Sequence, residues 1–292
     1  MRRKEYEELE ITDDFMFWNI LTSRPDLCKE LLELILGISI ARISPPEGQK
    51  TIEMTYDAKG IRLDVYINDE NGTVYDLEMQ TVLTKELPKR IRYYQGMIDL
   101  NLIQRGASYR ELKRSYIIFF CTCDPFGKRL PVYTFENRCR EDSSISLRDD
   151  AAKVIINPES DRTGLSIEMN DFLDLLQGKK NVSGLAKKLS DAVDNAKERK
   201  KWEVDYMTMQ MILQEERNEA REEGLSIGRE EGLSIGREEG LSIGREEGLA
   251  AGKIETLISL ARDGLLTVDA AASRADIPAE QFRALMEAQA AL

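Results

Sequence analysis

Two alternating segments joined by an Asn-Gly pair constrain the fold of this chain more than any other feature. Apolar side chains occupy every second position from residue 61 to 67, and again from residue 75 to 79. This period predicts two strands, with Arg62, Asp64 and Tyr66 on the polar face of the first. Because Asn71 and Gly72 lie between the segments, we expect an antiparallel hairpin.

The polar faces of these strands carry two acidic residues, Asp64 and Glu78. A three-residue loop of Glu70, Asn71 and Gly72, with Gly72 in the left-handed conformation, places the two acids opposite each other. A four-residue loop would put them on different faces. Opposite residues point to the same face with Cβ atoms about 5 Å apart, so the two charges repel unless a cation lies between them. Hard oxygen ligands of this kind suit Mg²⁺ or Mn²⁺; the alternative is an exposed strand face with scattered charges.

The sequence contains no histidine. This excludes Ser-His-Asp and Cys-His catalysis, histidine-ligated zinc, and nucleases that use a histidine base. Hydrolytic chemistry would therefore rest on carboxylates, a metal ion, or Lys, Arg, Tyr and Gln side chains. Four cysteines are too few for a disulfide scaffold, and Cys121 and Cys123 are expected to be reduced thiols in an apolar strand. No apolar run is long enough to cross a bilayer and no secretory signal begins the chain, so we expect a cytoplasmic protein without a membrane partner.

The net charge of −12 is unevenly distributed. Residues 221–292 hold eight basic and fourteen acidic side chains, which is half of the excess. Residues 85–129 hold ten basic and four acidic side chains, a net charge of +6. A basic surface beside a carboxylate cluster is what a metal-dependent phosphodiesterase site needs. The alternative is that these residues form ordinary solvated helix faces.

Helix and strand signals alternate through the first part of the chain. A capped helix start is predicted at Thr12-Asp13-Asp14, and a second helix from Pro25 to Gly37. Another helix is predicted from Pro88. This order predicts an α/β domain around a mixed sheet. Further strands are expected at Ile52, Met54 and Tyr56, at residues 116–120 and at residues 132–135.

The C-terminal part is predicted to be helical and repetitive. Residues 168–220 are followed by four tandem copies of Arg-Glu-Glu-Gly-Leu-Ser-Ile-Gly, the last one degenerate, over residues 221–252. In a helix, eight residues advance about 80° beyond two turns, so the leucines would not form a stripe. The repeat is either a spacer of variable length or a site of close self-association along its glycines. Residues 253–292 are predicted to form a small helical unit, whose net charge of −2 favours helical packing over DNA contact.

Residues 10–180 resemble the PD-(D/E)XK nuclease family transposases, also called the recombination-promoting nucleases. The resemblance implies a restriction-endonuclease-like core with a mixed β-sheet flanked by helices, plus a helical C-terminal extension. We expect a nuclease-like domain at 1–180, a helical connector at 181–220, the repeat spacer at 221–252 and the helical unit at 253–292. The motifs that carry the resemblance are Ile-Thr-Asp-Asp-Phe-Met-Phe (11–17), Arg-Leu-Asp-Val-Tyr (62–66), Leu-Glu-Met-Gln (77–80), Arg-Ile-Arg-Tyr-Tyr (90–94), Tyr-Arg-Glu-Leu (109–112), Tyr-Ile-Ile-Phe-Phe (116–120) and Asp-Pro-Phe (124–126).

The resemblance also implies the site residues. Asp64 and Glu78 would be the catalytic acids that bind Mg²⁺, with Mn²⁺ as a substitute, helped by the Met79 carbonyl. The metal ion would activate a water for attack on the scissile phosphorus. Leu63 stands where the motif name has Pro, and Gln80 stands where Lys is expected. Glutamine can hydrogen-bond a water or a phosphate oxygen but cannot neutralise charge.

Basic residues of the following helix are candidates for the missing positive charge. Arg90 or Arg92 could supply it, and with Lys89 they are the expected contacts to phosphate and DNA. Asp14 is a candidate further carboxylate, or alternatively a helix N-terminal charge.

The chain is therefore predicted to be a Mg²⁺-dependent DNA endonuclease that hydrolyses phosphodiester bonds, with a C-terminal repeat that forms homo-oligomers. The alternative is a weak or inactive nuclease-fold protein that serves as a DNA-binding or protein-interaction module.

Overall fold

The computed structural model describes residues 4–53, 60–82 and 84–290, which form two compact units, Met1–Gln210 and Met211–Leu292. The first unit is an α/β structure and the second is helical. Each has its own hydrophobic core. The predicted residues Met54 and Tyr56 of the first strand lie outside the described residues.

The first unit is built on a six-stranded mixed sheet in the order β1-β2-β3-β4-β6-β5. Strands β1, β2 and β3 are antiparallel to one another, β3, β4 and β6 are parallel, and β5 is antiparallel to β6. The predicted mixed sheet is thus confirmed, although β6 was not predicted. The strands are β1 (Glu47–Ile52), β2 (Ile61–Asn68), β3 (Val74–Gln80), β4 (Ser115–Cys121), β5 (Val132–Phe135) and β6 (Ala151–Ile156).

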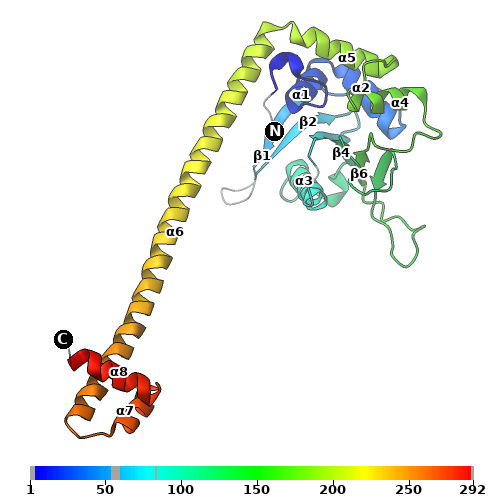
Figure 1. The fold of residues 1–292 in the computed structure, drawn as a ribbon. Helices are drawn as coiled ribbons and strands as arrows, with labels where there is room; N and C mark the ends of the chain where they lie inside the picture. Colours follow the sequence, from blue (N-terminus) through cyan, green and yellow to red (C-terminus); the bar gives the residue numbers. More distant parts are fainter. Residues whose placement is uncertain (1–3, 54–59, 83, 291–292) are drawn as a thin grey trace. The chain divides into compact units, whose positions relative to one another are not determined.

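Helices cover both faces of the sheet (Figure 1). Four of them pack against one face in a large core, in which Phe120 of β4 contacts Phe17 and Phe172. The opposite face is covered by α3, and Ile91 and Ile98 of this helix pack in a second core with Phe119. The four helices on the first face are α1 (Asp14–Ser23), α2 (Pro25–Leu36), α4 (Ile167–Leu176) and α5 (Gly184–Lys197), and α3 is Leu87–Leu102.

Helix boundaries in the first unit follow the sequence signals. Helix α1 begins at Asp14, directly after its N-cap Asp13. Helix α2 begins at Pro25 and ends before Gly37, which has φ +64° and donates its N–H to the Glu33 carbonyl. Only a residue that tolerates the left-handed region ends a helix in this way at low cost.

The first unit runs to Gln210, beyond the boundary expected at residue 180. The reason is that α5 contributes to the large core and that the following helix α6 (Lys200–Arg262) begins against α1. Tyr206 of α6 donates its hydroxyl to the Lys4 carbonyl at 2.8 Å, and its ring lies 5.2 Å from that of Phe15. Tyr6 similarly donates to the carbonyl of Ala196 at 2.8 Å.

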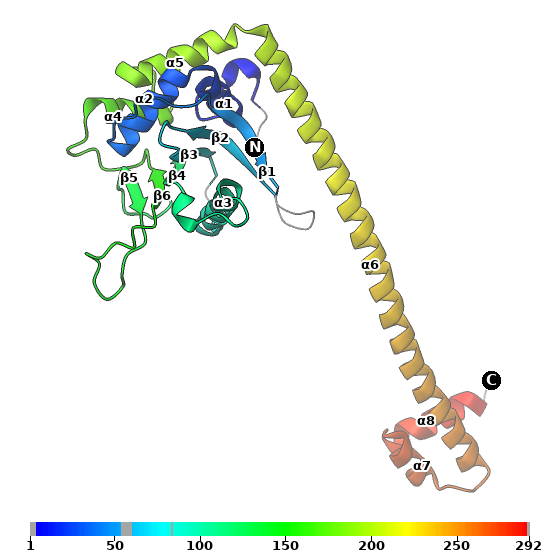
Figure 2. The ribbon, with the colours of Figure 1, turned by 180° about the vertical axis from the view of Figure 1, so that it is seen from behind.

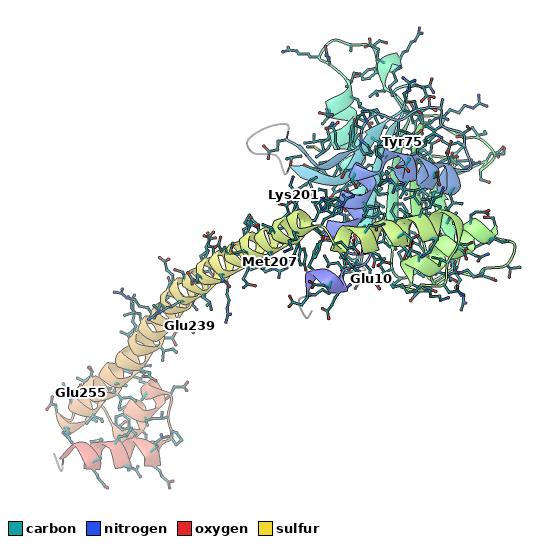
Figure 3. All side chains as sticks on the ribbon, turned by 90° about the horizontal axis from the view of Figure 1, so that it is seen from above. Glu10, Tyr75, Lys201, Met207, Glu239 and Glu255 are labelled. Atoms are coloured by element: carbon teal, nitrogen blue, oxygen red, sulfur yellow. The ribbon has the colours of Figure 1, made fainter. Side chains whose placement is uncertain are left out.

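The second unit contains the rest of α6, α7 (Val268–Ala275) and α8 (Ala279–Ala290). The small core of these helices consists of Leu257, Ile258, Ala271, Ala272 and Phe282. The tandem repeat is entirely α-helical, and side chains project from it around α6, as at Glu239 (Figure 3). Its leucines and isoleucines from Leu225 to Leu249 are 50–68% exposed. No helix of the described ranges has the length and apolar character that crossing a membrane requires.

Candidate active site

The β2-β3 hairpin has the register that brings Asp64 and Glu78 together. Asp69 donates its N–H to the Thr73 carbonyl, and Gly72 has φ +80°, so the loop consists of three residues as predicted. The backbone pairs from Asn68↔Val74 to Val65↔Leu77 continue this register toward the two acids. The predicted opposition of Asp64 and Glu78 is therefore confirmed.

Side-chain hydrogen bonds replace the backbone ladder at this pair. The Asp64 N–H donates to Glu78 Oε1 at 2.9 Å, and the Met79 N–H donates to Asp64 Oδ2 at 3.1 Å. Strand β2 therefore separates from β3 at Asp64 and continues along β1. Ile61 and Leu63 accordingly pack in the core under α3, whereas Val65 packs in the core on the other face. The prediction that the apolar side chains of residues 61–67 all lie on one face is therefore wrong. The alternation of side chains is interrupted at Asp64, where β2 separates from β3, so the residues before and after it face different cores.

A third carboxylate, Asp76, lies on the same face of β3 as Glu78. We call Asp64, Asp76 and Glu78 the acid cluster. Asp76 is fully buried and Glu78 is only 4% exposed, since β3 lies between β2 and β4 and α3 covers this face of the sheet (Figure 2). Asp76 was not among the predicted site residues, although its position two residues before Glu78 in an alternating strand was a usable signal.

Burial and mutual repulsion disfavour the charged forms of the acid cluster. Burial raises the pKa of Glu78 well above its usual value, and the charges of Asp76 and Asp64 raise it further. Burial raises the pKa of Asp64 to about 6, opposed chiefly by the hydrogen bond from the Met79 N–H. The pKa of Asp76 is also raised well above its usual value by burial. A group of acids with this electrostatic character is typical of a functional site.

Gln80 and Arg90 meet beside the acid cluster. Arg90 donates from Nη2 to Gln80 Oε1, and Gln80 in turn donates from Nε2 to the Val82 carbonyl. The Arg90 guanidinium lies 5.0 Å from the ring of Phe119, which holds it over the sheet. Its positive charge lowers the pKa of Glu78, against the larger effect of burial. The first turn of α3 thus brings a cation next to Gln80, the residue that stands where the motif has Lys.

Two further residues lie near Asp64. Gln49 was not predicted, and Asp14 was predicted with two alternative roles. Gln49 donates from Nε2 to Asp64 Oδ1 at 3.3 Å, from a backbone with φ +55°, and nothing in the sequence signals this conformation. Asp14 lies in the first turn of α1, and its negative charge contributes to the raised pKa of Asp64. Its side chain is open to solvent, so Asp14 is at once a helix N-terminal charge and a neighbour of the cluster.

Arg92 and Lys89 lie apart from the Gln80–Arg90 pair. Both side chains are exposed. Arg92 lines a separate cavity of about 740 Å³ between α3 and β6, together with Gln95 and Asp99 of the same helix. Of the three predicted basic residues, the structure brings only Arg90 to the acid cluster.

The acid cluster fits a hard divalent cation. Its donor atoms are carboxylate oxygens, the ligands that Mg²⁺ and Mn²⁺ prefer. Asp76 is fully buried with its carboxyl group in hydrogen-bonding contact with that of Glu78, and within the described residues none of the three carboxylates forms an ion pair. Among those same residues, no three Cys, Asp or Glu side chains surround one point as a ready metal site. Metal ligation by Asp64 and Glu78 stays a prediction from the sequence.

Comparison with known proteins adds one finding. Residues 12–138 match the family model of the PD-(D/E)XK nuclease family transposases. This segment contains the acid cluster, Gln80 and Arg90, and the match confirms the resemblance seen in the sequence motifs. The sheet with its flanking helices has the restriction-endonuclease-like α/β architecture that this family implies. No match is found among the curated proteins or the solved structures.

Proposed function

From the nuclease-family match of residues 12–138, we propose that the chain is a divalent-metal-dependent DNA endonuclease that hydrolyses phosphodiester bonds. The observation that carries this proposal is the opposition of Asp64 and Glu78 at the point where β2 separates from β3. The buried Glu78 and the half-buried Asp64 offer a hard-oxygen donor set and the charge that a divalent cation requires.

In this proposal Asp64 and Glu78 bind Mg²⁺, or Mn²⁺ in its place, and the Met79 carbonyl is a further ligand. When bound, the ion activates a water and neutralises charge on the phosphate. In a chain without histidine, the ion thereby replaces a histidine base. Gln80 orients the water or a phosphate oxygen through its amide. Arg90 holds that amide and supplies the positive charge that a lysine would have carried. Lys89 and Arg92 contact the DNA backbone on the exposed side of α3.

The experiment is cleavage of supercoiled plasmid by the purified chain with Mg²⁺, with Mn²⁺ and with EDTA. We expect nicked or linear product with either ion and none with EDTA. Asp64→Asn and Glu78→Gln should each reduce the rate by roughly a thousandfold, since losing the ion removes several kcal/mol of transition-state stabilisation. Asp99→Asn is the matched control, because Asp99 is a half-buried acid on α3 whose pKa is also raised by burial but which lies outside the acid cluster. Unchanged cleavage in either site variant would remove the assignment.

The glutamine at position 80 favours a second candidate function. Without the lysine of the motif, the same fold could bind DNA, or another protein, without turnover. This alternative predicts DNA binding that weakens with salt and does not lead to metal-dependent cleavage.

We also propose that the C-terminal repeat assembles copies of the chain. The support is the exposure of every leucine and isoleucine between Leu225 and Leu249 on a helix that offers them no intramolecular partner in the described residues. Eight glycines at every fourth position also leave this helix with low intrinsic stability. The cytoplasmic location stays a prediction from the sequence.

A further inference from the structure

The cavity of about 740 Å³ between α3 and β6 lies outside the acid cluster, and the proposed chemistry does not use it. On its floor, Lys153 of β6 lies directly opposite Phe135 of β5. Opposite residues of an antiparallel pair point to the same face with Cβ atoms about 5 Å apart, so a cationic and an aromatic side chain start side by side. The volume is in the range of sites for small organic ligands, roughly 300–1,000 Å³.

Two aromatic side chains give the cavity a flat apolar surface. Phe135 is 44% exposed, although its ring packs against that of Phe126 with 5.2 Å between the centroids. Phe126 is held in turn by Tyr133 of the core under α3, with 4.9 Å between the ring centroids. A large ring that is anchored on one side and open on the other is a surface on which a planar ligand stacks.

The charged side chains that line the cavity leave its cations available to a ligand. Each lining acid accepts a hydrogen bond from a protein donor, namely Asp99 from Gln95, Glu136 from Arg138 and Asp149 from Asn137. The lining basic side chains form no ion pair within the residues that the structure describes, and they are Arg92, Lys113 and Lys153. The half-buried Lys153 donates from Nζ to the Ala151 carbonyl at 3.5 Å, a long contact that leaves its charge uncompensated. An anionic group in the cavity would pair with these cations.

We propose that this cavity binds one nucleotide, with the base stacked on Phe135 and the phosphate held by Lys153 and Arg92. The two parts of the ligand follow from the two parts of the lining. A nucleobase is planar and stacks on aromatic rings, and a phosphate pairs with ammonium and guanidinium groups. The nucleotide is either free or an unpaired unit of a DNA strand, since both have this chemistry. The inference goes beyond the proposed function, because it requires neither the metal ion nor cleavage.

The test is calorimetric titration of the full-length chain with dGMP, whose purine offers a large stacking surface, in the presence of EDTA. We expect saturable binding, and binding at least about tenfold weaker for deoxyribose 5-phosphate, which lacks the base. Phe135→Ala should weaken dGMP binding on the order of tenfold through the lost stacking. Lys153→Met should do so to a similar extent through the lost charge. Tyr109→Ala is the matched control, because Tyr109 is an 86% exposed aromatic residue that does not line the cavity.

A second titration distinguishes the two sources of the nucleotide. It compares a single-stranded oligonucleotide with an abasic strand of the same length. If dGMP does not bind, but the oligonucleotide binds more tightly than the abasic strand and Phe135→Ala removes this difference, the cavity takes a unit of a DNA strand.

The proposal is overturned if neither ligand with a base binds better than its counterpart without one. It is also overturned if Phe135→Ala and Lys153→Met both bind like the wild type. Should Phe135→Ala not fold, Phe135→Leu removes the ring and keeps an apolar contact to Phe126. Because EDTA is present throughout, a failure here leaves the proposed metal-dependent cleavage untouched, and a failure of cleavage leaves this site untouched.

Discussion

At the scale of single residues, the exchange at position 80 shapes the site most. A lysine would place one mobile charge beside the acids, whereas Gln80 is fixed by hydrogen bonds to both the Val82 carbonyl and Arg90. The guanidinium is packed over Phe119, 5.0 Å from its ring, and always charged. The sequence named Arg90 and Arg92 as equal candidates. Only the packing of α3 on the sheet distinguishes them, because residues two apart in a helix point to nearly opposite sides.

This division of labour predicts a charge effect at Arg90. Arg90→Met should lower the cleavage rate on the order of a hundredfold, as expected when a preorganised charge near the reacting phosphate is removed. Adding Gln80→Lys to that variant should restore part of the rate, because the new ammonium occupies the place of the lost guanidinium. Arg217→Met, at an exposed position of α6 with no assigned role, should leave turnover nearly unchanged, and plasmid cleavage kinetics would measure all three. Equal rates in the wild type and Arg90→Met would show that Gln80 acts without its arginine.

At the scale of elements, the hairpin is the part that local chemistry specifies best. The Asn-Gly pair fixes a three-residue loop, and this loop fixes the register that pairs Asp64 with Glu78. Strand β6 illustrates the opposite case. Its sequence, Ala-Ala-Lys-Val-Ile-Ile, has no clean alternation because the strand lies inside a sheet with helices on both faces, and a period analysis finds no signal there.

The loop conformation predicts opposite effects for one substitution at two glycines. Gly72→Ala should destabilise the chain by about 1–2 kcal/mol, since φ +80° strains a residue with a Cβ and Lys113 carbons lie 3.3–3.5 Å from that atom. Gly96→Ala, on an open face of α3, should stabilise it by about 1 kcal/mol, because alanine favours the helix and nothing lies within 4 Å. The free energy of unfolding of the first unit, measured by urea denaturation, tests both predictions. A stabilising Gly72→Ala would contradict the left-handed loop.

At the scale of the whole molecule, the two units differ in what their sequences encode. The first unit packs its buried apolar side chains in two cores on either side of the sheet. The second has one small core near its C-terminal end, whereas the repeat within α6 has no intramolecular packing among the described residues. Helices with an unpacked apolar surface are usually covered by a partner. Because the repeats of two copies present the same surface, we expect this partner to be a second copy of the chain.

Removal of the repeat therefore predicts a change in assembly. A chain ending at residue 220 keeps the first unit with Tyr206 and its contacts to Lys4 and Phe15, so it should fold. Light scattering after size-exclusion chromatography should give an oligomer for the full-length chain and a monomer for the shortened one. If the full-length and the shortened protein contain the same number of chains per particle, the tail has no role in assembly and the spacer interpretation is supported.

The sequence by itself determined the features that depend on neighbouring residues. These are the helix starts at Asp14 and Pro25, the helix end at Gly37, the hairpin loop, and through its register the meeting of Asp64 and Glu78. The absence of histidine and the ordered motifs determined the chemistry to look for. Each of these rests on local geometry, so a period or a turn signal suffices.

Only the tertiary structure decided the features that depend on elements far apart in the chain. The burial of Asp76, the choice of Arg90 over Arg92, and the contact of Gln49 with Asp64 arise because α3 and β1 cover or adjoin the β2-β3 hairpin. The membership of α5 in the first unit has the same origin. Electrostatic environment is set by everything packed around a charge, and no periodicity in a single strand carries that information.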